Sequence, residues 1–153
     1  MPIGSDTHVH VGRLPHLTKP DKTYFVTFCS KSRRVLTPTE RDLALQACVE
    51  GHDRLYWMHC AVIMPDHVHL LIWPFDELPL PKAIGRIKGT SAYQINKVRA
   101  SSGHVWQREY FDRIVRSDES LSAKADYIWK NPVRKRLVAA ADEWPWFWRA
   151  PAG

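Results

Sequence analysis

The sequence has 153 residues, 44% of them hydrophobic, which suits one ordinary domain that buries its own core without disulfides. Its apolar stretches fall short of the roughly 20 residues that a membrane span needs, and its first residues lack the apolar core of a secretory signal. A formal net charge of +6 and a pI near 9.4 favour a polyanionic partner.

The first 22 residues contain scattered prolines and glycines without a sustained period, so we interpret residues 1–22 as an irregular N-terminal arm. The three cysteines show no C-x-x-C spacing, and their odd number argues against a disulfide framework. We therefore expect a cytoplasmic protein with no membrane partner, in which residues 1–153 form a single domain.

A strand and a helix are predicted next along the chain. Residues 23–29 are rich in aromatic and β-branched side chains, which are typical of a strand. Thr37, Pro38 and Glu40 match a capping box, in which the threonine accepts from an orphan backbone N–H and the glutamate reaches back. We expect this helix to continue to about Gly51.

A hairpin and a second helix follow. The apolar runs 57–64 and 67–73 are separated only by Pro65 and Asp66, which favours a turn between antiparallel strands. From residue 81 to about 99 the apolar positions recur at helical spacing. The positions on this stripe are Ile84, Ile87, Ser91, Ile95 and Val98.

The last third of the chain predicts a strand and a helix. Residues 105–115 are aromatic and β-rich, and their number suggests that part of the segment is loop. The last helix is expected to begin at Ser117 or Asp118 as its N-cap and to end at Asn131, because Pro132 follows.

This element order predicts an α+β fold of the ferredoxin-like, split β-α-β type: an antiparallel sheet with helices packed on one face and an added C-terminal helix. In this topology the first and third strands are central. Residues 67–73 should therefore cross the middle of the sheet.

Two histidines are the first candidate site residues. Because side chains alternate along a strand, His67 and His69 share one face while Val68, Leu70 and Ile72 share the other. The aliphatic face can pack under the helices, and the two imidazoles are then close enough to bind one divalent ion. Two structural or half-exposed histidines are the alternative interpretation.

A tyrosine and an asparagine form the second candidate pair. Tyr127 and Asn131 are four residues apart on the last predicted helix and so face the same way. A phenol attacks phosphorus only with help from a metal, a base or a positive field. The alternative is an ordinary tyrosine at the edge of the core.

Taken together, residues 23–146 resemble the HUH single-strand endonucleases, and within them the IS200-like single-tyrosine transposases, particularly the REP-associated tyrosine transposases. The resemblance is carried, in this order, by YFVTF (24–28), AVIMPDHVHLLI (61–72), KGTSAYQINK (88–97), VWQREYFDRIVR (105–116), DYIWKNPVRKRLV (126–138) and WPW (144–146).

The resemblance implies that His67 and His69 bind a divalent ion, Mg²⁺ or Mn²⁺, and that Asn131 is a third ligand. It implies that Tyr127 is the nucleophile of a transposase that cuts single-stranded DNA at hairpins through a 5′-phosphotyrosine intermediate. The segment before Thr23 departs from the usual family N-terminus, so no DNA-reading role is transferred to it.

Basic and aromatic side chains suggest a DNA surface. The candidate phosphate contacts are Arg33, Arg34, Lys88, Arg108, Arg113 and Arg116, and the candidate base-stacking residues are Trp106, Tyr110 and Phe111. Solvated charges and core aromatics are the alternative interpretation of each.

Two rival functions remain open at this point. The chain could be a non-catalytic module that grips hairpin DNA, or a metal-dependent hydrolase that uses water and for which Tyr127 is incidental. Both a monomer and a homodimer are compatible with the sequence, so the site could be built within one chain or across two.

Overall fold

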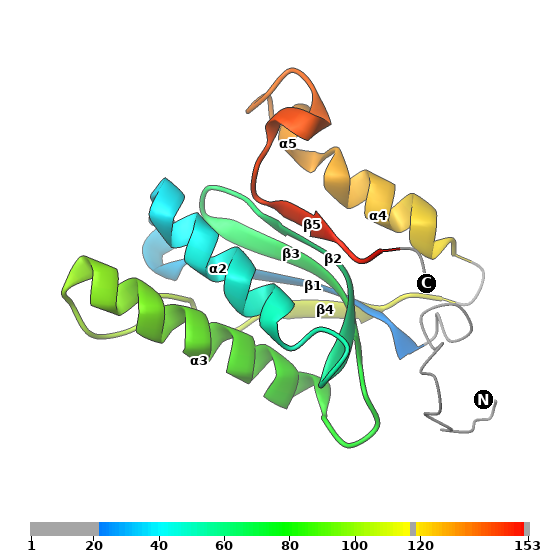
Figure 1. Cartoon of the computed structure of the whole chain (residues 1–153), viewed down its shortest axis with the longest axis horizontal. Coiled ribbons are helices and arrows are strands. Elements are labelled where there is room, and N and C mark those ends of the chain that lie inside the picture. Colours follow the sequence, from blue (N-terminus) through cyan, green and yellow to red (C-terminus); the bar gives the residue numbers. More distant parts are fainter. Residues whose placement is uncertain (1–21, 117–118, 152–153) are drawn as a thin grey trace.

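The computed structural model describes residues 22–116 and 119–151, and Figure 1 shows how the elements are arranged. The strands are β1 (Tyr24–Cys29), β2 (Tyr56–Ile63), β3 (His67–Pro74), β4 (Phe111–Ile114) and β5 (Phe147–Arg149). They form one antiparallel sheet in the order β4-β1-β3-β2-β5. The central positions of β1 and β3 confirm the predicted topology.

The helices are α2 (Pro38–Glu50), α3 (Leu80–Arg99), α4 (Leu121–Trp129) and the one-turn α5 (Asn131–Arg134), with short 3-10 turns η2 (Lys31–Arg33) and η3 (Ala141–Glu143). The predicted capping box is present at the start of α2: Glu40 N donates to Thr37 Oγ1, and Thr37 N donates to Glu40 Oε1. The predicted hairpin is β2–β3.

The two faces of β3 belong to different layers. Val68, Leu70 and Ile72 are buried in the main core together with side chains of α2 and α3. Leu71 points to the opposite face and packs in a second cluster with Ala125 and Ile128 of α4. The fold is therefore α+β as predicted, and the appended helix α4 lies across the sheet from α2 and α3 (Figure 1).

The predicted stripe of α3 is wrong at its last position. Ile84, Ile87, Ser91 and Ile95 are buried, but Val98 is 55% exposed. The stripe continues from Ile95 with a spacing of four residues, which places Arg99 rather than Val98 toward α2. There Arg99 pairs with the buried carboxylate of Glu40.

The fourth strand is shorter than predicted, because Phe111–Ile114 form the ladder with β1, and Trp106 adds only one isolated bridge to Ser30. Residues 105–110 instead cross from α3 to the sheet as a loop. The Lys88 ammonium fixes this loop by donating to the carbonyl groups of Gln107 and Arg108. The backbone carbonyl groups of Gln107 and Arg108 thus have a side chain as their hydrogen-bond donor.

Several predicted features need correction or lie outside the described residues. The helix α4 begins after the N-cap Ser120, whose Oγ accepts from Ala123 N. The predicted caps, Ser117 and Asp118, lie outside the described residues, as does nearly all of the predicted arm, residues 1–22.

The sequence patterns missed β5, which pairs with the outer edge of β2. Two aromatic residues hold it: Trp144 Nε1 donates to Ile63 O, and Ile63 N donates to Trp146 O. No helix in the described part of the chain is long and apolar enough to cross a membrane.

The buried ion pair between Glu40 and Arg99 gives a prediction for stability. Glu40→Gln keeps a side chain that can complete the capping box, but it leaves the Arg99 guanidinium, whose side chain is only 10% exposed, without its carboxylate. We expect the free energy of unfolding in urea to fall by about 3 kcal/mol at neutral pH, because an unpaired charge stays buried.

This loss should depend on pH. Burial raises the pKa of Glu40, but hydrogen bonds from Arg99 and from Thr37 N–H hold it below its ordinary value. The carboxylate therefore stabilises the fold above its unfolded-state pKa, and the benefit is lost as the pH falls through the folded-state value. The difference in the free energy of unfolding between wild type and Glu40→Gln should therefore disappear in acid.

Asp126→Asn is the control, because it breaks the exposed ion pair with Arg149. It should lower the free energy of unfolding by less than about 1 kcal/mol. Equal losses in the two variants would contradict the prediction.

Candidate active site

The predicted histidine pair lies on the face of β3 that looks toward α4. The ring centroids of His67 and His69 are 4.8 Å apart and the planes cross at 76°. The ring of His69 also stacks on Phe25 of β1, with centroids 5.4 Å apart. The two imidazoles are therefore held side by side on rigid strands, as the alternation along β3 predicts.

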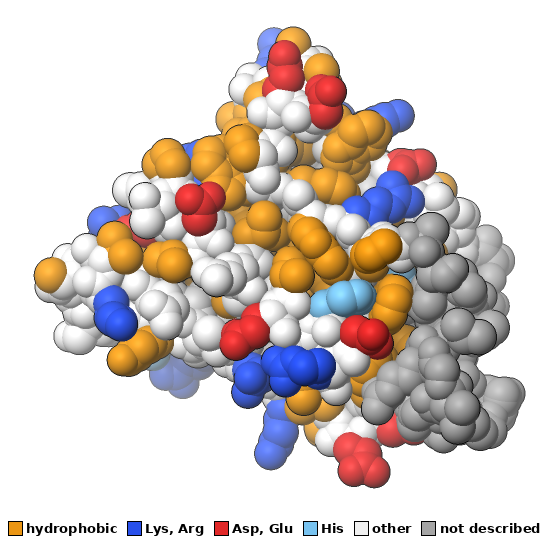
Figure 2. Space-filling model, in the orientation of Figure 1, with side chains coloured by type: hydrophobic (Ala, Val, Ile, Leu, Met, Phe, Trp, Pro, Cys, Tyr) orange, Lys and Arg blue, Asp and Glu red, His pale blue; other side chains and the backbone are white. Residues whose placement is uncertain are grey.

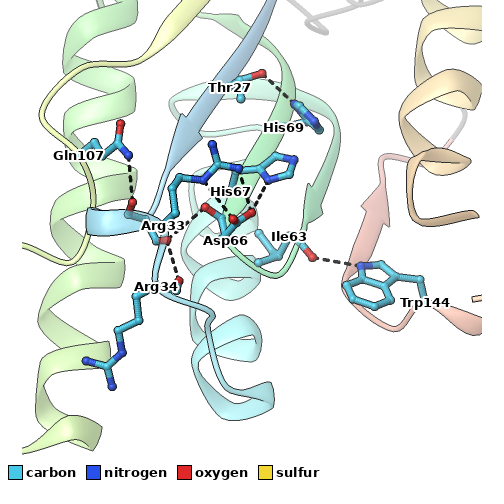
Figure 3. Close-up of polar contacts among 10 residues, drawn as sticks. Thr27, Arg33, Arg34, Ile63, Asp66, His67, His69, Gln107 and Trp144 are labelled. Carbon is cyan, nitrogen blue, oxygen red and sulfur yellow. Dashed lines mark hydrogen bonds and ion pairs between the residues drawn. The ribbon is translucent and has the colours of Figure 1, made fainter. Parts of the chain in front are cut away.

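Each imidazole has one nitrogen engaged with a neighbouring side chain (Figure 3). His67 Nδ1 lies 2.8 Å from Asp66 Oδ1, and His69 Nδ1 lies 2.8 Å from Thr27 Oγ1. A carboxylate can only accept, so His67 donates from Nδ1, and in the neutral form of the ring the Nε2 lone pair is then available. This is the arrangement that a metal-binding imidazole needs.

Asp66 is itself held by Arg33 of η2. The guanidinium donates from Nε to Oδ2 over 3.0 Å and from Nη2 to Oδ1 over 3.1 Å, so the pair is bidentate (Figure 3). Burial raises the pKa of Asp66, but the hydrogen bonds from Arg33 and His67 lower it below its ordinary value. The carboxylate is therefore ionised at neutral pH and can orient His67.

His69 is neutral at neutral pH. Burial lowers its pKa to about 3, with further contributions from the charges of His67, Lys135 and Arg134. A neutral imidazole is the form that binds metals. Neither Thr27 nor Asp66 was among the site residues predicted from the sequence, although Asp66 is the neighbour of His67 in the motif.

Tyr127 and Asn131 reach the same place from the helical layer. They line one cavity of about 660 Å³ together with His67 and His69. Tyr127 is 55% exposed, whereas Asn131 is buried and its Nδ2 has no hydrogen-bond partner. The residues that line the cavity include Arg33, Arg134 and Lys135, and none of the described ones is acidic, so the cavity is positively charged.

The prediction that Tyr127 and Asn131 share one helix is wrong. The helix α4 ends at Trp129, and Asn131 begins α5. Pro132 has no N–H to donate to the carbonyl of Ile128, so the α4 ladder cannot continue through it. Lys130 N still donates to Asp126 O, which keeps the break shallow and leaves both side chains on the cavity side.

The donor set fits a divalent cation in part. His67 and His69 offer imidazole nitrogens, and Asn131 Oδ1, which accepts one hydrogen bond from Arg134 Nη2, keeps a second lone pair that is suited to ligation. Within residues 22–116 and 119–151, no three His, Cys, Asp or Glu side chains converge on one point. A cation here would therefore need oxygen ligands from Asn131, from water or from a bound substrate.

The predicted phosphate contacts are divided between several places. Arg33 lines the cavity but is paired with Asp66, and Arg113 forms a bidentate pair with Glu119. Lys88 donates its hydrogen bonds to carbonyl groups of the 105–110 loop, and Arg108 lines a separate cavity of about 410 Å³. Arg34 and Arg116 are exposed, and Arg116 N donates to Glu119.

Of the three predicted stacking residues, Phe111 alone has a largely exposed ring, at 72%. Trp106 is buried and donates to Ser91 Oγ, and Tyr110 packs against the main core. Phe111 lies opposite Thr27 in the β1–β4 ladder and lines the cavity. On the face seen in Figure 2, basic side chains are interspersed with acidic and hydrophobic ones, so this view contains no single basic patch.

Comparison with known proteins gives consistent matches. The sequence model described as "Transposase IS200 like" matches residues 19–131. A REP-associated tyrosine transposase of Escherichia coli is 25% identical over 129 residues, which cover 80% of this chain and 73% of that protein. A protein of Haemophilus influenzae, provisionally named a REP-associated tyrosine transposase, is 29% identical over 94 residues. That match covers 55% of this chain, which spans about half (53%) of the relative's length.

A solved structure of a REP-associated tyrosine transposase bound to a REP hairpin is also similar. It has a TM-score of 0.65 and 23% sequence identity, over 83% of this chain and 76% of that one. At this level of identity the likeness establishes a shared fold.

The contact between Asp66 and His67 predicts the tautomer of an imidazole. In the wild-type protein, at a pH where His67 is neutral, long-range ¹H–¹⁵N spectra should show its proton on Nδ1, because Asp66 accepts there. Asp66→Ala removes the acceptor, so a population protonated on Nε2 should appear. Thr27→Val is the control: it should alter the ring signals of His69 and leave those of His67 unchanged. An unchanged His67 in Asp66→Ala would refute the assignment.

Proposed function

The chain belongs to the IS200-like transposase family, and we propose that it is a DNA transposase that nicks and rejoins single-stranded DNA at hairpins, with Tyr127 as the nucleophile. One observation carries the proposal: the cavity is lined by Tyr127 and Asn131 from α4 and α5 and by His67 and His69 from β3. The half-exposed ring of Tyr127 can meet a DNA strand there.

The proposed step is a transesterification. The Tyr127 oxygen forms a bond to the scissile phosphorus as the bond from phosphorus to the 3′ oxygen breaks. The phenol gives up its proton and the departing oxygen takes one up, so the products are a 5′-phosphotyrosine and a 3′-hydroxyl with no net change in protons. Attack by a 3′-hydroxyl on the phosphotyrosine reverses the step and rejoins DNA.

His67 and His69, with Asn131, would hold a divalent cation, Mg²⁺ or Mn²⁺. When bound, the cation supplies Lewis-acid polarisation of the phosphate. The chain itself supports this use of the residues in two ways: Asp66 and Thr27 each hold an Nδ1, and burial keeps His69 neutral. Lys135 adds positive charge where a phosphate would enter.

Hairpin DNA is proposed as the partner because a related structure contains a REP hairpin and because this chain carries a net charge of +6. The exposed Phe111 beside the cavity is suited to stack on an unpaired base. The two histidines, Tyr127 and Asn131 of the same chain line one cavity, which favours a site built within one chain, in a monomer or in each subunit of a homodimer. We propose that residues 1–153 act as one domain in the cytoplasm.

The assignment of the nucleophile predicts the effect of Tyr127→Phe. This change removes one oxygen from a half-exposed ring, so folding and binding of hairpin DNA should survive. The covalent protein–DNA adduct should disappear, because the bond to phosphorus cannot form. The measurement is a shifted band after incubation with labelled single-stranded hairpin DNA and Mn²⁺ or Mg²⁺.

Tyr93→Phe is the matched control, because Tyr93 is 64% exposed but lies on α3, outside the cavity. It should form the adduct at the wild-type rate. Cutting without any adduct in the wild type would indicate the metal-dependent hydrolase, and binding without cutting would indicate the hairpin-binding module. Normal adduct formation by Tyr127→Phe would rule out this nucleophile.

The assignment of the metal ligands predicts weaker binding of Mn²⁺ by His67→Ala and His69→Ala. Loss of one imidazole ligand should lower the affinity at least about 10-fold, and removal of the positioning group in Asp66→Ala should lower it by about 10- to 100-fold. Electron paramagnetic resonance of free Mn²⁺ measures this without DNA. His104→Ala is the control, because His104 lines the separate 410 Å³ cavity; equal effects in all these variants would argue against a site at the histidine pair.

A further inference from the structure

Arg134, at the end of α5, contacts both polar residues that the helical layer brings to the cavity. Its Cζ lies 3.6 Å from the centre of the Tyr127 ring, and its Nη2 donates to Asn131 Oδ1 over 3.2 Å. The next cation, Lys124, has its Nζ 5.7 Å from the same ring centre. Arg134 also lines the cavity beside the histidines. The guanidinium therefore lies between the proposed nucleophile and the proposed third ligand.

The local backbone explains why these three side chains meet. Residues 127, 131 and 134 have the i, i+4, i+7 spacing of one helical face. The break before Pro132 preserves this face, since Lys130 N donates to Asp126 O and Arg134 N donates to Lys130 O. Arg134 thus reaches back over Tyr127 although the two lie on successive helices.

The charge of Arg134 differs from that of four described arginines whose side chains form ion pairs. Arg33, Arg99, Arg113 and Arg149 each face a carboxylate. Within the described residues, Arg134 has no such ion pair, and its guanidinium lies on an aromatic face. An arginine does not lose its proton in proteins, so this positive charge is permanent.

The position of Arg134 over the Tyr127 ring suits the chemistry of the proposed attack on phosphorus. As the phenol loses its proton and attacks, its ring becomes richer in electrons, and a cation over the ring face attracts the ring more strongly in that state. An interaction that strengthens during the step accelerates it. The hydrogen bond to Asn131 fixes the guanidinium plane, so the cation needs no reorganisation when the step occurs.

We propose that Arg134 is a positioning residue that locks the Tyr127 ring and the Asn131 amide together and holds a permanent positive charge against the attacking phenol. This inference rests on the proposed function of Tyr127. It distinguishes Arg134 from residues that only hold DNA phosphates, because its effect falls on the covalent step rather than on affinity.

The test compares Arg134→Gln with Arg136→Gln. Both variants lose one positive charge from the same segment, but Arg136 does not line the cavity. Adduct formation on hairpin DNA with Mn²⁺ is followed in single turnovers over a range of protein concentrations. Arg134→Gln should lower the rate at saturation by about 10- to 100-fold and leave the half-saturating concentration nearly unchanged. Arg136→Gln should keep the wild-type rate at saturation.

A rescue experiment separates the charge from a general loss of structure. Arg134→Lys should recover part of the rate, because the ammonium keeps the charge but lacks the planar fork. In Arg134→Ala, guanidinium ions at a non-denaturing concentration should raise the rate, whereas the same concentration of sodium chloride should not. Thermal unfolding of each variant reports whether the fold is kept.

Three outcomes would overturn the inference: an unchanged rate at saturation in Arg134→Gln, equal losses in the two glutamine variants, or weaker DNA binding alone. The proposed function fails by a different result, which is a normal adduct in Tyr127→Phe. If Tyr127→Phe is inactive while Arg134→Gln is as fast as wild type, the assignment of Tyr127 as the nucleophile is supported and the proposed role of Arg134 is wrong.

Discussion

Side chains of β3 alternate between two layers, and both layers depend on this alternation. Val68, Leu70 and Ile72 are fully buried under α2 and α3, while His67 and His69 face the cavity. A slip of one residue in the register would turn the aliphatic side chains toward the cavity and bury the imidazoles among the hydrocarbon side chains of the main core. The hydrophobic free energy of the main core therefore also fixes the position of the histidines.

The second layer completes the cavity with a cluster of buried side chains that is smaller than the main core. The helix α4 holds to the sheet through Ala125 and Ile128, and the intervening Tyr127 is left partly in solvent. Two of the positive side chains that line the cavity have partners, because Arg33 is bound to Asp66 and Arg134 is stacked on the tyrosine ring. A phosphate would enter a site whose charges are already oriented.

The sequence predicted the elements that rest on local rules. The capping box at Thr37, the Pro65–Asp66 turn and the alternation along β3 each follow from a few neighbouring residues. Contacts between distant segments gave no such signal: nothing in the sequence indicated that Lys88 would bind the carbonyl groups of the 105–110 loop, or that Arg33 would pair with Asp66 instead of staying free. The candidate site was predicted from its motifs, and the residues that contact it, such as Thr27 and Asp66, became visible only in the fold.

The sheet ends on both sides in very short strands, β4 with four residues and β5 with three. An unpaired strand edge is a template for another chain, and long, flat, apolar edges promote aggregation. Here each edge is short, and the strand β4 carries Asp112 and Arg113, whose charges would be desolvated by a further strand. The outer strands therefore protect a strongly apolar sheet from edge-to-edge association, which leaves its cavity face available to a partner that is not another sheet.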